Sequence, residues 1–144
     1  QIGGRDYKVH LDGYDQTALF TGKSDKSARK FVFYYDETVL TAIRYESFKV
    51  TFSMKEGGHW DDPLVGLGRP LITNLRMDPF ERAEHENAMG YQRWYMDRMF
   101  LIAPAGAYVG QWLQSFKEFP PRQKPGSFNL DRVMEAVMQG PPSK

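Results

Sequence analysis

Residues 39–55 read VLTAIRYESFKVTFSMK, and this stretch decides the fold. From Phe48 to Met54 every second residue is apolar, and the residues between them are lysine, threonine and serine. A period of two is typical of a β-strand with one covered face and one face in water. Residues 39–45 alternate in a similar way, which places Leu40 and Ala42 on one face and Ile43 on the other. The stretch therefore predicts an antiparallel hairpin.

The flanks of this hairpin supply further strands. Residues 30–36 are rich in aromatic and β-branched side chains, which favour strands. Glycine and proline predict a loop over residues 57–68, and residues 70–75 offer another short strand. A loop of this length is typical of a functional segment or of one that packs on a neighbour. The sequence thus predicts a four-stranded antiparallel meander.

Helical signals follow the fourth strand. Asp78, Pro79 and Glu81 match an N-cap, a first-turn proline and a capping-box glutamate, so we expect a helix over residues 78–86. A second helical pattern covers residues 91–101. A third begins at Pro104, and its apolar stripe is wide enough to cover the sheet. That stripe consists of Ala105, Tyr108, Val109, Trp112, Leu113 and Phe116.

The two ends of the chain give weaker patterns. Alternation over residues 7–11 favours one edge strand, and residues 15–22 fit a single helical turn with Ala18, Leu19 and Phe20 inward. Asn129 is expected to cap a last short helix. The inward face of that helix would be Leu130, Val133, Met134 and Val137. The predicted fold class is α+β, a single domain over residues 1–144 with a four-stranded antiparallel sheet covered on one face by C-terminal helices.

Composition excludes several classes of function. The 144 residues carry 19 Lys and Arg against 18 Asp and Glu, and a net charge of +1 gives no global field for nucleic acid. No cysteine is present, which excludes disulfides, thiolate metal sites and a cysteine nucleophile. No apolar run approaches the ~20 residues of a membrane span. The chain begins at Gln1 without a methionine, so we expect a piece of a longer parent, for which a periplasmic or extracellular location is favoured.

His59 and Trp60 are the candidate binding residues. They lie within the predicted loop, where an imidazole and an aromatic ring suit contact with a ring-bearing substrate or a neighbouring domain. The alternative is that Trp60 folds back as a buried loop anchor. Asp61 and Asp62 beside it are either cation ligands or, as is more usual for acidic pairs in glycine loops, solvated turn formers.

Other constellations carry less chemistry. The three histidines lack metal-ligand spacing, because Met89 stands where a zinc-protease helix beginning at His85 needs its second histidine. No nucleophile elbow, phosphate loop or dinucleotide motif is present. Arg44 and Lys49, together with nearby tyrosines, leave open a stand-alone module that binds glycan or RNA through an aromatic sheet face. The tyrosines concerned are Tyr34, Tyr35 and Tyr45.

An ordered set of blocks resembles the C-terminal region of bacterial arylsulfatases. The resemblance covers essentially the whole chain, and its specificity comes from the order and spacing of the blocks. Phe48 stands where that family usually has tryptophan before a lysine, which keeps an aromatic anchor. The blocks are residues 12–15 (DGYD), 19–22 (LFTG), 29–31 (RKF), 34–35 (YY), 42–45 (AIRY), 48–49 (FK), 73–81 (TNLRMDPFE) and 116–121 (FKEFPP).

The resemblance implies a division of labour. Arylsulfatases join a large catalytic α/β domain to a smaller C-terminal domain, a four-stranded antiparallel sheet packed by a helix. Their formylglycine, made from the first residue of a C/S-x-P-x-R signature, and their calcium ion belong to the N-terminal domain. This segment therefore has no implied catalytic residue and no cofactor of its own. Its implied partner is the N-terminal sulfatase domain of the same chain, and the parent's substrate is a sulfate ester.

Overall fold

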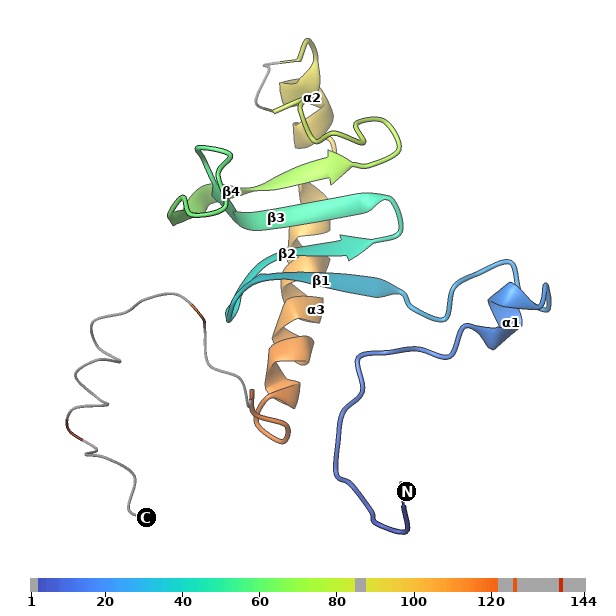
Figure 1. Cartoon of the computed structure of the whole chain (residues 1–144). Helices are drawn as coiled ribbons and strands as arrows, with labels where there is room; N and C mark the ends of the chain where they lie inside the picture. Colours follow the sequence, from blue (N-terminus) through green and yellow to red (C-terminus); the bar gives the residue numbers. More distant parts are fainter. Residues whose placement is uncertain (1–2, 85–87, 122–125, 127–137, 139–144) are drawn as a thin grey trace.

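A computed structural model describes residues 3–84, 88–121, 126 and 138 of the chain. Its elements are, in order, α1 (Thr17–Phe20), β1 (Phe31–Asp36), β2 (Val39–Tyr45), β3 (Phe48–Lys55), β4 (Leu64–Asn74), α2 (Tyr91–Met96), the 3-10 helix η1 (Met99–Leu101) and α3 (Ile102–Ser115). The strands form one antiparallel sheet in the order β1-β2-β3-β4. Helix α3 crosses one face of this sheet (Figure 1). The predicted α+β meander is confirmed.

The core lies between the sheet and the helices α2 and α3. Ile43, Val50 and Ile72 pair directly across β2, β3 and β4, and all three are at least 96% buried. Ala105 of α3 and Tyr95 of α2 close the cluster from the other side. Ala105 and Val109 of the predicted stripe therefore pack on the sheet, whereas Leu113 is 43% exposed.

Aromatic rings join α3 to the outer strand β1. Tyr108 lies over Phe31 with ring centroids 4.2 Å apart, and Trp112 stacks on Phe33 at 4.6 Å. The indole N–H of Trp112 also donates a hydrogen bond to the hydroxyl of Tyr35 at 2.7 Å. Alternate residues of β1 thus face the helix, as the strand period requires.

An irregularity in the β1–β2 ladder changes the predicted faces of β2. Tyr34 pairs with Ala42, but the next residue, Tyr35, pairs with Leu40. Thr41 is left unpaired, and its hydroxyl donates to the carbonyl of Tyr34 at 3.2 Å. The extra residue is a β-bulge, and it puts Leu40 on the helix side together with Tyr35. The expectation that Leu40 and Ala42 share a face is wrong for this reason.

Strand β4 is longer than predicted, and the loop before it is shorter. The strand begins at Leu64, so Gly66 and Gly68 lie inside it. Thr51 pairs with Leu71 while Ser53 pairs with Gly66, which leaves a wide irregularity in β4. Glycine and proline are tolerated in a strand at such a place, and here they gave the false loop signal.

Two tyrosines of α2 donate hydrogen bonds to β4, at the irregular part and just after it. The hydroxyl of Tyr95 donates to the carbonyl of Pro70 at 2.8 Å, and that of Tyr91 donates to the carbonyl of Ile72 at 3.0 Å. Burial, reinforced by the nearby carboxylate of Glu84, raises the pKa of Tyr91 to about 12. Tyr91 therefore stays a neutral donor, and the two bonds fix α2 against the sheet.

The helix predicted to begin at Asp78 is wrong over the residues described, 78–84. Asp78 does accept backbone N–H bonds, but from Arg82 and Ala83, four and five residues on, at 3.0 and 2.9 Å. Glu81 has a φ of 56°, in the left-handed region, and its carboxylate bonds Lys49 instead of returning to the cap. A non-glycine residue in that conformation interrupts a helix, so a turn forms.

The N-terminal residues form an extended arm rather than an edge strand. Helix α1 confirms the single helical turn, although Phe20 is 83% exposed and not inward. The last helix expected after Asn129 and its face at residues 130–137 lie outside the described residues, as does His85. None of the helices in the described part of the chain has the length and apolar character needed to cross a membrane.

Candidate functional site

The loop of residues 56–63 joins β3 to β4 and carries both candidate binding residues. The Asp62 carboxylate accepts the backbone N–H of His59 at 2.7 Å and closes the loop as a turn. A Cβ at residue 57 would collide with that carboxylate, so any other residue there would push Asp62 away from the N–H of His59. Asp62 therefore forms a turn, which is the second of the two interpretations of the acidic pair.

Lys55 holds the loop in place by its backbone. Its ammonium group donates to the carbonyl of Trp60 at 2.5 Å and pairs with the Asp36 carboxylate at 3.2 Å. Lys55 thus holds the main chain of Trp60, whereas the indole of Trp60 is 88% exposed. The alternative that Trp60 is a buried loop anchor is therefore wrong.

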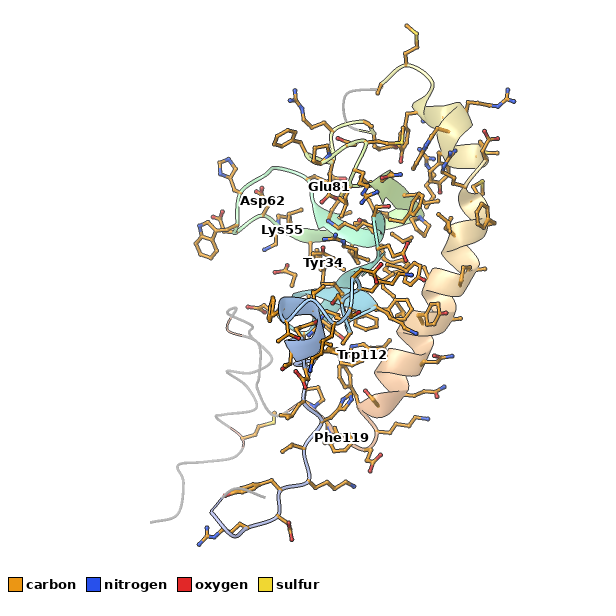
Figure 2. All side chains as sticks on the ribbon, turned by 90° about the vertical axis from the view of Figure 1, so that its right-hand side faces the viewer. Tyr34, Lys55, Asp62, Glu81, Trp112 and Phe119 are labelled. Carbon is orange, nitrogen blue, oxygen red and sulfur yellow. The ribbon has the colours of Figure 1, made fainter. Side chains whose placement is uncertain are left out.

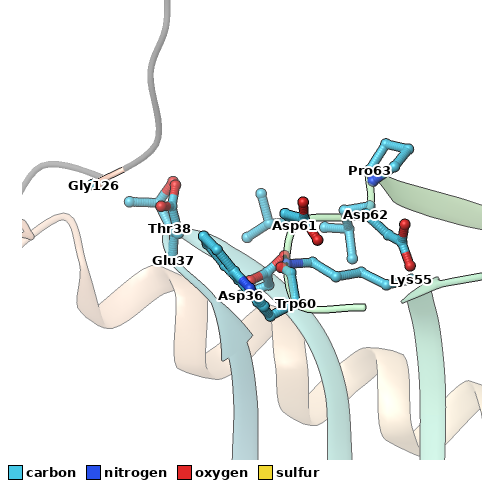
Figure 3. Close-up of a pocket in the computed structure, with 11 residues that line it drawn as sticks. Asp36, Glu37, Thr38, Lys55, Trp60, Asp61, Asp62, Pro63 and Gly126 are labelled. Atoms are coloured by element: carbon cyan, nitrogen blue, oxygen red, sulfur yellow. Dashed lines mark hydrogen bonds and ion pairs between the residues drawn. The ribbon is translucent and has the colours of Figure 1, made fainter. Parts of the chain in front are cut away.

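A groove of about 1000 Å³ lies beneath this loop (Figure 3). One wall is the loop with Trp60, and the other is the turn between β1 and β2. The side of the sheet away from α3 carries this loop, as the position of Asp62 in Figure 2 shows. Its lining residues are Asp36, Glu37, Thr38, Val39, Lys55, Trp60, Asp61, Asp62, Pro63, Leu64 and Gly126.

The groove is acidic. Four carboxylates line it, against the single ammonium group of Lys55, which already pairs with Asp36. Such a lining repels a sulfate or phosphate group and suits hydroxyl-bearing neutral groups. Among residues 3–84 and 88–121, no group of three or more His, Asp or Glu side chains has the arrangement of a metal site.

The sequence predicts the loop but not the opposite wall of the groove. Trp60 lines the groove, whereas His59 belongs to the same loop without lining it. Asp36, Glu37 and Lys55 were missed. The predicted meander does indicate that the two walls lie together, because the first and third turns of an antiparallel meander lie at the same end of the sheet.

The aromatic sheet face proposed as an RNA or glycan platform does not form. Tyr34 and Tyr35 are consecutive in β1 and point to opposite faces. Tyr35 and Tyr45 lie on the helix side, where Tyr45 contacts Phe31 at 5.2 Å. Tyr34 lies under the Lys49 ammonium at 4.8 Å on the other side. The three rings therefore cannot bind one ligand together.

The N-terminal arm contacts α3 and the turn after it through two polar side chains. Lys8 pairs with Glu118 at 3.0 Å, and the His10 ring lies 5.7 Å from Trp112, beyond the centre of α3. The apolar side chains of the arm are exposed as well. Tyr7, Val9 and Leu11 are 56%, 50% and 76% exposed. Exposed apolar side chains close together on one segment are typical of a surface that a partner covers.

Comparison with solved structures gives an informative match. The chain resembles the crystal structure of the PsFucS1 sulfatase from Pseudoalteromonas sp., with a TM-score of 0.61 and 25% sequence identity. The match covers 78% of this chain and 22% of that one. The chain contains a sulfatase-like domain. The chain spans about a fifth of the length of that sulfatase. No protein-family model and no curated protein matches the chain.

Proposed function

We propose that this sulfatase-like domain is the C-terminal, non-catalytic domain of an arylsulfatase-type sulfuric ester hydrolase. The observation that carries the proposal is the uneven coverage of the structural match, which takes in 78% of this chain but only 22% of the sulfatase. The rest of such a protein, an N-terminal domain of the same chain, would hold the reactive groups. The domain described here would complete the fold of the parent.

The reactive groups do not fit the residues of this domain. A formylglycine requires a C/S-x-P-x-R signature, which the sequence lacks. A calcium ion requires several oxygen ligands together, and no such group of side chains exists in the described residues. Both belong, in this proposal, to the N-terminal domain.

The exposed apolar side chains of the arm support a partner of this kind. Tyr7, Val9 and Leu11 lie exposed on a segment whose polar residues contact α3 and the turn after it. Covering such side chains removes apolar surface from water, at about 25 cal/mol per Å². The N-terminal sulfatase domain is the partner that we assign to this surface.

The loop of residues 56–63 would then stand at the rim of the substrate pocket. The indole of Trp60 is free to lie against a ring, while the acidic groove repels the sulfate group itself. The loop would thus contact the organic part of the sulfate ester, with His59 beside it.

Turnover of an aryl sulfate ester tests the proposal. The 144-residue chain alone should give none with calcium added, and the chain joined to the segment encoded upstream should hydrolyse the ester. The upstream reading frame should encode the C/S-x-P-x-R signature. Turnover by the pure 144-residue chain, or an upstream frame without the signature, would overturn the proposal.

A pair of variants tests the role of the loop. In the joined protein, Trp60→Ala should raise KM about tenfold, since one aromatic contact contributes about 1–3 kcal/mol, and Trp60→Phe should restore most of it. Because Trp60 is 88% exposed, neither variant should change the urea midpoint. An unchanged KM for Trp60→Ala would remove the loop from the pocket rim.

A further inference from the structure

A second cleft, of about 560 Å³, lies at the end of β1 opposite the acidic groove. It is formed by the segment that enters β1 and by the end of β2, where Val32 pairs with Arg44. Val32 lines this cleft and Asp36 lines the groove, and these two residues of β1 are about 13 Å apart at the strand rise. The lining residues are Lys26, Ser27, Arg29, Lys30, Val32, Arg44, Tyr45 and Glu46.

This cleft is basic. Four cationic side chains line it against the one carboxylate of Glu46. Arg29 is partly neutralised by Asp12, at 3.3 Å. Among the residues that the structure describes, Lys26, Lys30 and Arg44 have no carboxylate partner. The net charge of +1 for the whole chain therefore hides two sites of opposite sign.

The two arginines are held in position without a ligand. The guanidinium group of Arg29 lies 4.7 Å from the ring centroid of Tyr14 and donates to the backbone carbonyl of Asp12. Arg44 donates through Nε to the carbonyl of Glu46 at 2.7 Å, and its two terminal nitrogens have no partner within the described part of the chain. Donors fixed in this way lose little conformational freedom when an anion binds.

The cleft also has enough room for more than a single ion. A volume of about 560 Å³ falls in the range of small-molecule sites. Four cations in a cleft of this size fit an oxyanion carried on a sugar.

We propose that this cleft binds a sulfate group of a carbohydrate chain that carries several sulfates, at a position remote from the sulfate that the parent hydrolyses. The inference rests on the proposed function, and it names the substrate class as a sulfated polysaccharide. Arginine forks and lysines bind tetrahedral oxyanions by charge-assisted hydrogen bonds. The acidic groove excludes sulfates at the other end of β1, so the two sites fix the direction in which a polyanion lies on the domain.

Calorimetric titration of the 144-residue chain tests the proposal. The ligands are a sulfated oligosaccharide, the same oligosaccharide after desulfation, and a single-stranded RNA of equal charge. We expect binding of the first, weakened by added salt, and at least tenfold weaker binding of the other two. Equal affinity for the desulfated sugar or for RNA would overturn the assignment.

Two charge-reversed variants locate the site. Lys30→Glu should weaken binding of the sulfated oligosaccharide about tenfold, as expected for loss of a charged hydrogen bond. Lys117→Glu makes the same change in net charge at an exposed lysine that does not line the cleft, and it should change affinity by less than about twofold. Equal losses in both variants would show a diffuse charge effect and overturn the proposal.

The joined protein separates this inference from the proposed function. Lys30→Glu should leave turnover of a small aryl sulfate unchanged while raising KM for the sulfated oligosaccharide. Aryl sulfate turnover without polyanion binding would overturn the cleft alone. Polyanion binding by a joined protein that hydrolyses no sulfate ester would overturn the proposed function alone.

Discussion

The ion pair between Lys49 and Glu81 leads to an asymmetric prediction. The Lys49 ammonium lies 2.8 and 2.9 Å from the two carboxylate oxygens of Glu81, and the side chains are 16% and 38% exposed, respectively. In Glu81→Gln the ammonium group keeps an amide oxygen and the ring of Tyr34, at 4.8 Å, but it loses its counter-charge at a place that water reaches poorly. Without the ammonium group, the more exposed carboxylate is hydrated. Glu81→Gln should therefore destabilise the fold more than Lys49→Met.

The two costs can be estimated from exposure. Stranding a partly buried charge costs about 1–3 kcal/mol. Losing an ion pair whose remaining carboxylate is hydrated costs about 1 kcal/mol or less. Residue 81 stays Glu in Lys49→Met and becomes the similarly shaped Gln in Glu81→Gln. The cost of its left-handed backbone (φ 56°) is therefore the same in both variants. The double variant strands no charge and should resemble Lys49→Met.

Urea unfolding of the 144-residue chain measures these differences through the transition midpoint at constant m. The wild type, both single variants and the double variant complete a cycle. Equal losses for the two single variants, or a larger loss for Lys49→Met, would refute the reasoning from unequal burial.

Three further predictions follow from the core and from the pKa shifts. Ile72→Ala should lower the free energy of unfolding in urea by about 2–5 kcal/mol, because Ile72 is 0% exposed. Val65→Ala, on the same strand but 36% exposed, should lower it by about 0.5 kcal/mol or less, and similar losses in the two variants would contradict the assigned core. Burial would raise the pKa of Asp78, but the backbone N–H groups that it accepts outweigh burial and lower it. Its stabilisation is thus present above the unfolded-state pKa and lost as the pH falls through the folded-state pKa, so acid should lower the urea midpoint less for Asp78→Asn than for the wild type. Burial raises the pKa of Tyr35, and the hydrogen bond from the indole N–H of Trp112 opposes this rise. Trp112→Phe should therefore raise the pKa of Tyr35 further in a spectrophotometric titration, and a lower pKa in the variant would contradict the hydrogen bond.

The sheet was predictable because its signal is local. The alternation from Phe48 to Met54 and the short turns at residues 37–38 and 46–47 fix strand type and order without reference to the rest of the chain. The stripe on α3 was predictable for the same reason. A bulge, in contrast, depends on how two strands pair, so the place of Leu40 could not be read from β2 alone.

The errors have a common physical origin in long-range contacts. Asp78, Pro79 and Glu81 have the local chemistry of a helix start, but Lys49 binds the glutamate from a strand 32 residues away. The exposure of Trp60 depends likewise on Lys55 and Asp36, which hold the main chain of the loop. The basic cleft also joins separate segments, so neither segment shows it alone.

The order of the strands has a consequence for how the chain folds. Each strand pairs only with its neighbours in sequence, so the sheet can close one hairpin at a time with little loss of chain entropy. The contact between Lys8 and Glu118 joins residues far apart in the sequence and needs both the sheet and α3 to exist first. We expect the arm to dock last and to exchange its amide hydrogens fastest, while β2 and β3 exchange theirs slowest.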